Sequence, residues 1–299
     1  MTDSSGFPAA QSKLTRHKDI GRLLLNCPDR RGVIAAVSTF LTKAGANIIS
    51  LDQHSTAPED GTFLQRTVFH LPGLAAAQPE LEREFAQIAT EFDIDYRFTD
   101  AAKPKRVAIM ASTADHCLLD LLWRNRRGEL DMTVVMVISN HADLAEQVRA
   151  FGVPFVHIPA NREIRQQAEQ RQLDLLKGNV DLVVLARYMQ IITPEFLGDI
   201  GCPLINIHHS FLPAFIGATP YRRAKERGVK LVGATAHYVT QDLDEGPIIE
   251  QDVVRVDHTH SVEELVRLGA DVERAVLSRA VLWHCQDRIL RHGNETVIF

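Results

Sequence analysis

The first hundred residues alternate between short apolar runs and amphipathic stretches. Apolar residues at helical spacing in residues 33–44 and 80–91 predict two helices, the first of which ends at Gly45. Runs rich in β-branched and aromatic residues predict strands at residues 22–27, 47–54, 62–71 and 93–98. The order strand, helix, strand, strand, helix, strand indicates a ferredoxin-like βαββαβ domain.

Beyond Pro104, strands and helices alternate regularly. The predicted strands lie at residues 106–111, 133–139, 154–157, 182–186, 204–207 and 231–239. The predicted helices lie at residues 115–126, 143–151, 162–177 and 261–291, and the last one opens on a capping box, Ser261-Val262-Glu263-Glu264. This alternation predicts a Rossmann-like α/β domain with a mostly parallel sheet, whose ligands lie at the carboxyl ends of the strands.

These patterns divide the chain into four parts. We expect a flexible leader at residues 1–19, a first domain at 20–100, a linker at 101–105 and a second domain at 106–299. A chain of 299 residues is long enough to bury two cores. The leader is polar and lacks the apolar core of a signal peptide.

Composition and charge exclude several classes of protein. Hydrophobic residues at 45% and charged residues at 24% are typical of a soluble globular protein. A formal net charge of −5 argues against a nucleic-acid partner. No apolar run approaches the roughly 20 residues that span a bilayer, so no membrane attachment is expected. The four cysteines are scattered without a Cys-x-x-Cys pair, which favours reduced thiols and a cytoplasmic location.

Polar side chains gather where two of the predicted strands end. Asn206 and His208 are two residues apart, so extended backbone points them to one side and His209 to the other. The strand at residues 231–239 leads into an acidic loop that contains Asp244. We expect Asn206, His208 and Asp244 to lie at the carboxyl ends of the strands. An amide, imidazoles and a carboxylate suit acyl transfer, because they can accept a proton and stabilise an oxyanion.

The same residues resemble a known catalytic pattern. Asn206-x-His208 with Ser210-x-x-Pro213, then His237 and Leu243-Asp244-x-Gly246-Pro247, is similar to the pattern of the folate-dependent formyltransferases. Most of those transferases carry a proline where this chain has His209. The variant here, with Phe211-Leu212-Pro213 and Gly217-Ala218-x-Pro220-Tyr221, resembles the formyltetrahydrofolate deformylases, which transfer the formyl group to water. The resemblance extends over residues 20–299.

The resemblance implies a role for each site residue. Asp244 would activate water, Asn206 and His208 would stabilise the oxyanion, and His237 and His209 would support them. Only the resemblance distinguishes Asp244 from Asp242, which shares its loop. The implied substrate is 10-formyltetrahydrofolate, and the residues expected to bind it are Met189, Gln190, Ile191, Ile192, Gly217 and Leu243.

A zinc site is the obvious rival use of the same side chains. His208, His209, His237 and Asp244 all carry groups that bind metals. No His-x-x-x-His on a helix and no nearby cysteine supports such a site, and the family that the motifs resemble uses no metal. We therefore expect neither a metal nor a cofactor.

The first domain carries a second resemblance. Its Asp29-x-x-Gly32 turn, Gly45 and Asn47-Ile48 resemble the ACT domains, small regulatory modules that often bind amino acids. An amino-acid effector would then lie near Asp29, Gly32 and Asn47. Pairing of such domains would make the protein an even-numbered homo-oligomer. The alternative is a domain that serves assembly alone.

Three functions remain to be compared. Hydrolysis of 10-formyltetrahydrofolate would balance one-carbon folate pools and supply formate for purine synthesis. Formyl transfer to an amine is the first alternative, but residues 110–117 lack the glycines that would let backbone approach a phosphorylated acceptor closely. A non-catalytic amino-acid or folate sensor is the second alternative, and the presence of Asn206, His208 and Asp244 argues against it.

Overall fold

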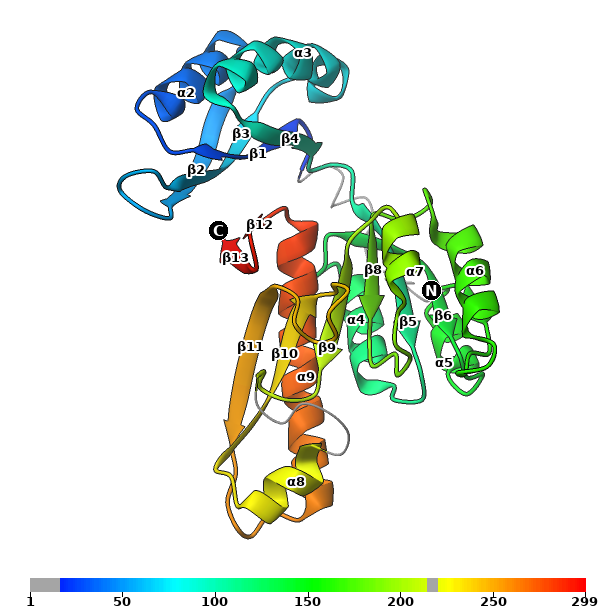
Figure 1. Ribbon diagram of the computed structural model, residues 1–299. Coiled ribbons are helices and arrows are strands. Elements are labelled where there is room, and N and C mark those ends of the chain that lie inside the picture. Colours follow the sequence, from blue (N-terminus) through cyan, green and yellow to red (C-terminus); the bar gives the residue numbers. More distant parts are fainter. Residues whose placement is uncertain (1–16, 214–219) are drawn as a thin grey trace, which may run out of the picture. The chain divides into compact units, whose positions relative to one another are not determined.

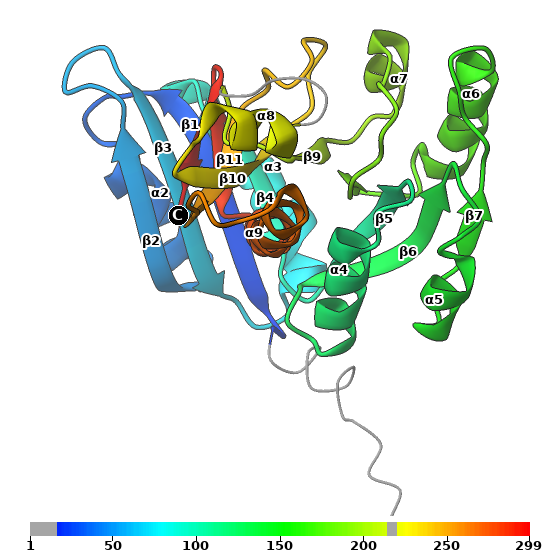
Figure 2. The same ribbon diagram turned by 90° about the horizontal axis from the view of Figure 1, so that it is seen from below.

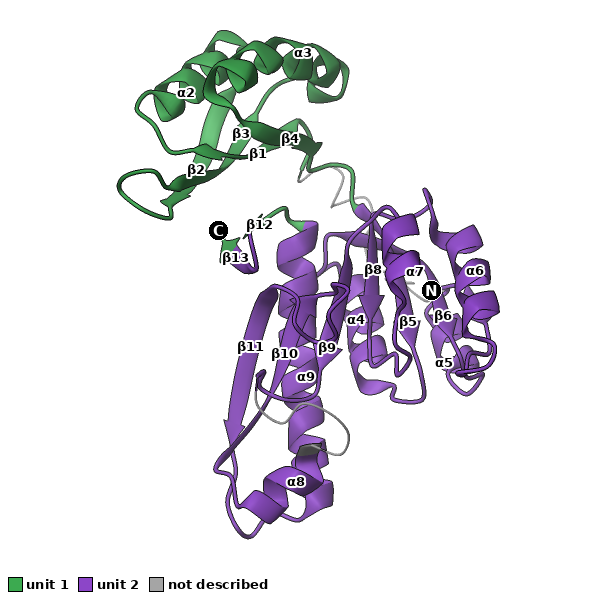
Figure 3. Ribbon diagram, in the orientation of Figure 1, with its two compact units in different colours: residues 1–104, 286–292, 297–299 green, residues 105–285, 293–296 purple. Residues whose placement is uncertain are grey.

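The structure is a computed structural model that describes residues 17–213 and 220–299 (Figures 1 and 2). The expected leader of residues 1–19 lies almost wholly outside the described residues. The chain forms two compact units (Figure 3). One ends at Pro104 and also contains Gln286–His292 and Val297–Phe299, and the other consists of Lys105–Cys285 and Gly293–Thr296.

The first unit has the ferredoxin-like plan that the sequence predicts. Its elements are β1 (Ile20–Pro28), α2 (Val33–Lys43), β2 (Asn47–Ser55), β3 (Thr62–His70), α3 (Leu74–Phe92) and β4 (Asp95–Asp100). The strands form an antiparallel sheet in the order β2-β3-β1-β4. Both helices pack on one face of this sheet (Figure 1).

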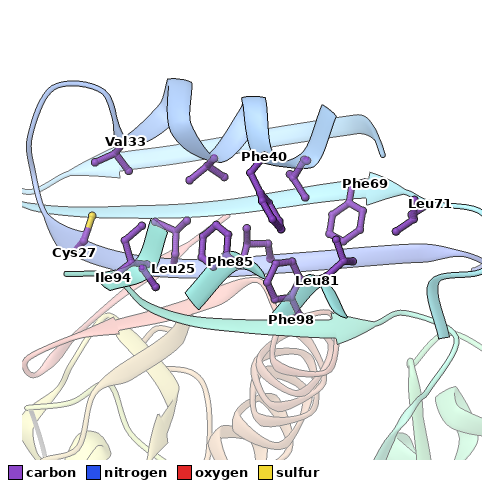
Figure 4. Close-up of a cluster of buried hydrophobic side chains, with 14 of the residues drawn as sticks. Leu25, Cys27, Val33, Phe40, Phe69, Leu71, Leu81, Phe85, Ile94 and Phe98 are labelled. Atoms are coloured by element: carbon purple, nitrogen blue, oxygen red, sulfur yellow. The ribbon is translucent and has the colours of Figure 1, made fainter. Parts of the chain in front are cut away.

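Aromatic rings from both layers fill the core of this unit (Figure 4). Phe40 of α2 meets Phe85 of α3 edge-to-face, with ring centroids 5.2 Å apart, and Phe85 also contacts Phe98 of β4. The sequence places the start of the second helix at residue 80, but α3 begins at Leu74. Pro79 interrupts the helical pattern, whereas burial of Leu74 in this core stabilises the additional turn.

The last helix ends earlier than the sequence predicts. Helix α9 spans Val262–Cys285 and not residues 261–291, and a hairpin of β12 (Ile289–His292) and β13 (Glu295–Ile298) follows it. Asp287 has φ of 52°, a left-handed conformation that a right-handed helix excludes. Its carboxylate accepts hydrogen bonds from Arg22, Arg97 and Thr99. These bonds explain why Gln286–His292 packs with the first unit, although the sequence assigns it to the second domain.

The second unit is an α/β structure around a seven-stranded sheet. Its strands are β5 (Lys105–Ala111), β6 (Met132–Ser139), β7 (Phe155–His157), β8 (Leu182–Leu185), β9 (Leu204–His208), β10 (Leu231–Tyr238) and β11 (Ile248–Arg255). Its other helices are α4 (His116–Arg126), α5 (Ala145–Ala150), α6 (Arg165–Leu176), α7 (Pro194–Asp199) and α8 (Pro220–Arg227). The strand order is β11-β10-β9-β8-β5-β6-β7. Strands β5 to β9 pair in parallel, as expected.

Helices cover both faces of this sheet (Figure 2). Ala108 and Met110 of β5 face a core formed with α6 and α7, whereas α9 packs on β9, β10, β11 and α4. None of the helices in the described part of the chain combines the length and hydropathy of a bilayer-spanning helix. Strand β11 was not predicted. It is an edge strand in which only Ile249 is buried, and the polar run Glu250-Gln251-Asp252 hides the strand pattern in the sequence.

The direction of β10 changes the expected placement of Asp244. Strand β10 pairs antiparallel with β9, so that His237 lies opposite Asn206 and Tyr238 opposite Ile205. The sequence suggested that the carboxyl ends of β9 and β10 lie side by side. They do not, because the two strands run in opposite directions. The loop after β10 turns back and places Asp244 on His208.

Candidate active site

His208 is the last residue of β9 and lies almost wholly buried. Its Nδ1 lies 3.2 Å from Oδ2 of Asp244. Its Nε2 is buried and has no hydrogen-bond partner among the described residues. The carboxylate thus holds one nitrogen of the ring, and the second nitrogen remains available to a ligand.

His237 connects the carboxylate to Asn206. Its Nδ1–H donates to the carbonyl of Tyr238 at 2.9 Å, because a carbonyl oxygen can only accept. Its Nε2 lies 3.2 Å from Nδ2 of Asn206 and 3.6 Å from Oδ1 of Asp244. His237 therefore lies between Asn206 and Asp244, with the same ring nitrogen facing both side chains.

The loop between β10 and β11 has a conformation that only certain residues allow. Asp244 has φ of 59° in the left-handed region. A Cβ atom at Gly246 would overlap the carbonyl oxygen of Tyr238. Among the two acidic candidates in this loop, Asp244 contacts His208 and His237, while Asp242 is exposed.

The charge of Asp244 follows from its partners. Burial raises the pKa of this carboxyl, but the hydrogen bonds and charges of His208 and His237 outweigh burial. The net result is a pKa below the ordinary value. Asp244 is therefore ionised across the physiological pH range.

A second buried polar cluster lies around Glu273 of α9. The Tyr221 hydroxyl donates to Oε1 of Glu273 at 2.8 Å, and His116 Nε2 lies 2.8 Å from Oε2. Arg187 Nε lies 3.5 Å from the same Oε2. Burial raises the pKa of Glu273, but the hydrogen bond of His116 and the charge of Arg187 hold it below the ordinary value.

Sequence reasoning missed this cluster. Glu273 lies in an amphipathic helix between the exposed Asp271 and the half-buried Arg274, so in the sequence it resembles a solvated residue. Its burial depends on His116, which is 157 residues away in sequence. The one signal in the sequence was Arg187, a charged residue two positions after a buried strand.

The same cluster contains groups that bind metals. One ligand atom each of His116, Cys117 and Glu273 could meet at a single ion. The guanidinium of Arg187 lies beside the Glu273 carboxylate and repels a cation. Burial also raises the pKa of the Cys117 thiol well above its ordinary value, which opposes the thiolate that a metal requires. The residues present therefore do not fit a divalent cation.

Three of the residues expected to bind the substrate are both apolar and exposed. Met189, Ile191 and Leu243 expose 59%, 53% and 61% of their surface, although all three are large and apolar. Gln190 and Ile192 are half-buried beside them in sequence, and Gly217 lies outside the described residues. Exposed apolar side chains are typical of a surface that an apolar ligand covers.

Two of the three expected effector residues lie together in the first unit. Asp29 and Gly32 line a cavity of about 770 Å³. Asn47 is exposed at the start of β2 and does not line that cavity. The Asp29 carboxylate accepts a hydrogen bond from the Ser55 hydroxyl.

Comparison with known proteins agrees with this arrangement of two units. Residues 105–281 match the formyl transferase family, and residues 21–86 match the ACT domain family. A formyltetrahydrofolate deformylase of Mycobacterium bovis is 78% identical over 294 residues, which are 98% of this chain and 95% of that protein. The chain belongs to the formyltetrahydrofolate deformylase family.

Other members of the family are less similar in sequence, but the match again covers nearly the full length of both chains. The formyltetrahydrofolate deformylase of Bacillus subtilis is 51% identical over 284 residues, which are 95% of each protein. The crystal structure of a formyltetrahydrofolate deformylase from Pseudomonas syringae pv. tomato superposes with a TM-score of 0.89 at 46% identity and covers 94% of each chain. The resemblance and the fold that the motifs predict are thus confirmed.

Proposed function

We propose that this protein hydrolyses 10-formyltetrahydrofolate to formate and tetrahydrofolate. The observation that carries the proposal is the buried Nε2 of His208, which has no partner among the described residues while Asp244 holds Nδ1. Such a nitrogen can donate to an oxyanion that forms only during the reaction. The deformylases that share up to 78% of their residues with this chain support the same activity.

The proposed reaction proceeds through a tetrahedral intermediate. Water adds to the formyl carbon, and the carbonyl oxygen becomes an oxyanion. The Asn206 amide and the His208 imidazolium donate to it, and the imidazolium then protonates the departing folate nitrogen. Asp244 accepts the proton that the attacking water loses, and its contact with His208 stabilises the positive charge on that ring. The folate is the substrate, and the proposed steps require no cofactor or metal.

The exposed apolar residues of the second unit suit the pterin of the folate. Met189, Ile191 and Leu243 would pack against the ring, and Gln190 and Ile192 would complete this surface. The backbone N–H of Met189 donates to the Ser112 hydroxyl, which fixes the start of the segment. Gly217 is also a proposed contact of the folate, and this proposal rests on the sequence resemblance alone.

The first unit has a proposed regulatory or assembly role. The expected domain of residues 20–100, together with the C-terminal segment that packs with it, would bind an amino acid beside Asp29 and Gly32. We also propose an even-numbered homo-oligomer and, because the four cysteines form no disulfide, a cytoplasmic location. The formate released would supply purine synthesis.

Formyl transfer to an amine is the alternative that an experiment must exclude. Purified protein should release formate from 10-formyltetrahydrofolate without any amine, and a chelator should not change the rate. A strict requirement for an amine would make the protein a transferase. Specific binding of folate or an amino acid without turnover would make it a sensor.

A further inference from the structure

The sheet of the second unit changes its direction of winding between β5 and β8. From β5 the chain proceeds to β6 and β7 on one side, and from β8 it proceeds to β9 on the other. Ligands of open α/β sheets bind at the carboxyl ends of the two strands between which the winding reverses. Ser112 directly follows β5, and Arg187 lies two positions after β8. Both residues therefore lie where this topology places a ligand.

Arg187 has a backbone conformation that arginine rarely adopts. Its φ is 62°, in the left-handed region, which costs free energy for a residue with a Cβ atom. The N–H of Ser112 donates to the Arg187 carbonyl, and the N–H of Met189 donates to the Ser112 hydroxyl, so the turn is held from both sides. Strained backbone of this kind is concentrated at functional sites. The Arg187 side chain is thus a candidate for binding a ligand.

Two nitrogens of the Arg187 guanidinium lack a hydrogen-bond partner among the described residues. Nε and Nη1 are both buried, and the nearest acidic oxygen, Oε2 of Glu273, lies 3.5 Å from Nε. Buried N–H groups are normally satisfied, so a group that is not indicates a position for a ligand or a bound water. The guanidinium is permanently charged and planar, and proteins use it widely to bind carboxylates. Arg187 therefore has the chemistry of an anion-binding residue.

The charge of Arg187 acts on the catalytic histidines. Burial and the charges of Arg187 and His208 lower the pKa of His209 to about 4, so the His209 ring is neutral near pH 7. The ring centroids of His209 and His208 lie 5.2 Å apart. On His208, Asp244 is ionised and repels other carboxylates. A small anion that forms beside His208 is therefore repelled by Asp244 and attracted by Arg187.

We propose that Arg187 binds the formate that the reaction releases. This inference rests on the proposed hydrolysis. The formyl group of the substrate is neutral, whereas formic acid is a carboxylic acid and is ionised near pH 7. The attraction to Arg187 therefore becomes strong only when the bond from carbon to the folate nitrogen has broken. Arg187 thus binds the product more tightly than the formyl group from which the product forms.

Inhibition by added formate tests this site. Release of tetrahydrofolate is measured in sodium formate and, at the same ionic strength, in sodium chloride. We expect formate to inhibit the unchanged protein. Arg187→Met should raise the inhibition constant by at least about 10-fold, because a charge-assisted hydrogen bond is lost. The KM for 10-formyltetrahydrofolate should remain close to that of the unchanged protein.

The chain offers controls for charge and for backbone strain. Methionine and arginine are both unbranched at Cβ, so Arg187→Met leaves the cost of the left-handed backbone nearly the same. Arg187→Lys retains the positive charge and should retain part of the inhibition. Arg126 is exposed at the end of α4, and Arg126→Met removes the same charge there. The inhibition constant of formate should be unchanged in the Arg126→Met protein.

The outcomes separate this inference from the proposed function. Formate that does not inhibit the unchanged protein, or that inhibits a folded Arg187→Met protein equally well, would overturn the inference. A higher KM for 10-formyltetrahydrofolate with unchanged inhibition by formate would also overturn it, because Arg187 would then bind a carboxylate of the folate tail. If Arg187→Met turns over too slowly, NMR titration of both proteins with isotope-labelled formate makes the same comparison without folate. If the unchanged protein releases no formate without an amine, the proposed hydrolysis itself fails before any variant is compared.

Discussion

At the scale of single residues, the site depends on the carboxylate of Asp244, which contacts both buried imidazoles. An Asp244→Asn substitution removes the charge that stabilises the His208 imidazolium. We expect formate release to fall by about 10²–10⁴-fold, the range typical of a lost acid–base group. Single-turnover measurement of formate with the unfolding midpoint recorded in parallel would check this.

Asp242 provides a matched control in the same loop. It is exposed and contacts neither histidine. An Asp242→Asn substitution should change stability by less than about 0.5 kcal/mol and leave turnover nearly unchanged. If Asp242→Asn abolished activity and Asp244→Asn did not, the assignment within this loop would be wrong.

The half-buried His209, next to His208, makes stability depend on pH. The pKa of His209 is about 4 in the folded protein, compared with an ordinary value of 6.5. Between these values the unfolded chain binds more protons, so the free energy of unfolding decreases as pH falls through this window. A His209→Gln protein lacks this pH-dependent contribution to the free energy of unfolding. Relative to it, the unchanged protein should lose at most about 2 kcal/mol between about pH 7 and pH 5 in urea denaturation. If the difference in the free energy of unfolding between the two proteins did not vary with pH, the lowered pKa of His209 would be wrong.

At the scale of elements, the loop between β10 and β11 is the part that must fold back correctly. A Gly246→Ala substitution would place a methyl group on the carbonyl oxygen of Tyr238 and displace the loop. We expect a destabilisation of about 1–3 kcal/mol and a loss of turnover, because Asp244 moves away from His208. Urea denaturation and formate release on the same samples would measure both.

Gly198 in α7 is the control for that substitution. A Cβ atom there would meet no atom within 4 Å. Gly198→Ala should be neutral, or stabilising by up to about 1 kcal/mol, since alanine favours a helix more than glycine does. If Gly198→Ala and Gly246→Ala changed stability and turnover equally, the geometry of the β10–β11 loop would not explain the effect of Gly246→Ala.

The sequence predicts the elements and part of the site because those depend on local patterns. Asn206 and His208 follow from the alternation of a strand, and the two-unit architecture follows from the order of strands and helices. The choice of Asp244 over Asp242 depends on an antiparallel strand, which short-range pattern does not specify. Glu273 and Asp287 are buried by partners 157 and 265 residues away, so no local signal distinguishes them from solvated residues.

At the scale of the whole molecule, the two ends of the chain depend on each other. The Asp287 carboxylate is 1% exposed and forms an ion pair with Arg22 of β1. An Asp287→Asn substitution leaves the buried guanidinium of Arg22 beside a neutral amide, at an expected cost of about 3–5 kcal/mol. Hydrogen exchange should therefore accelerate in β1 and β4 more than in β5.

Asp271→Asn is the matched control for that measurement. Asp271 pairs with Arg274 on the exposed face of α9, where an ion pair contributes less than about 1 kcal/mol. Hydrogen exchange in β1 and β4 should remain unchanged in this protein. Equal acceleration in the two variants would mean that the C-terminal segment does not stabilise the first unit.

The central claim is that water accepts the formyl group. The most direct measurement is a single turnover of 10-formyltetrahydrofolate by the purified protein in ¹⁸O-labelled water, without amine, followed by mass spectrometry of the formate. Attack of water on the formyl carbon predicts that each molecule of formate carries one oxygen atom from the solvent. Formate that contains no solvent oxygen, or none formed until an amine is added, would contradict the account.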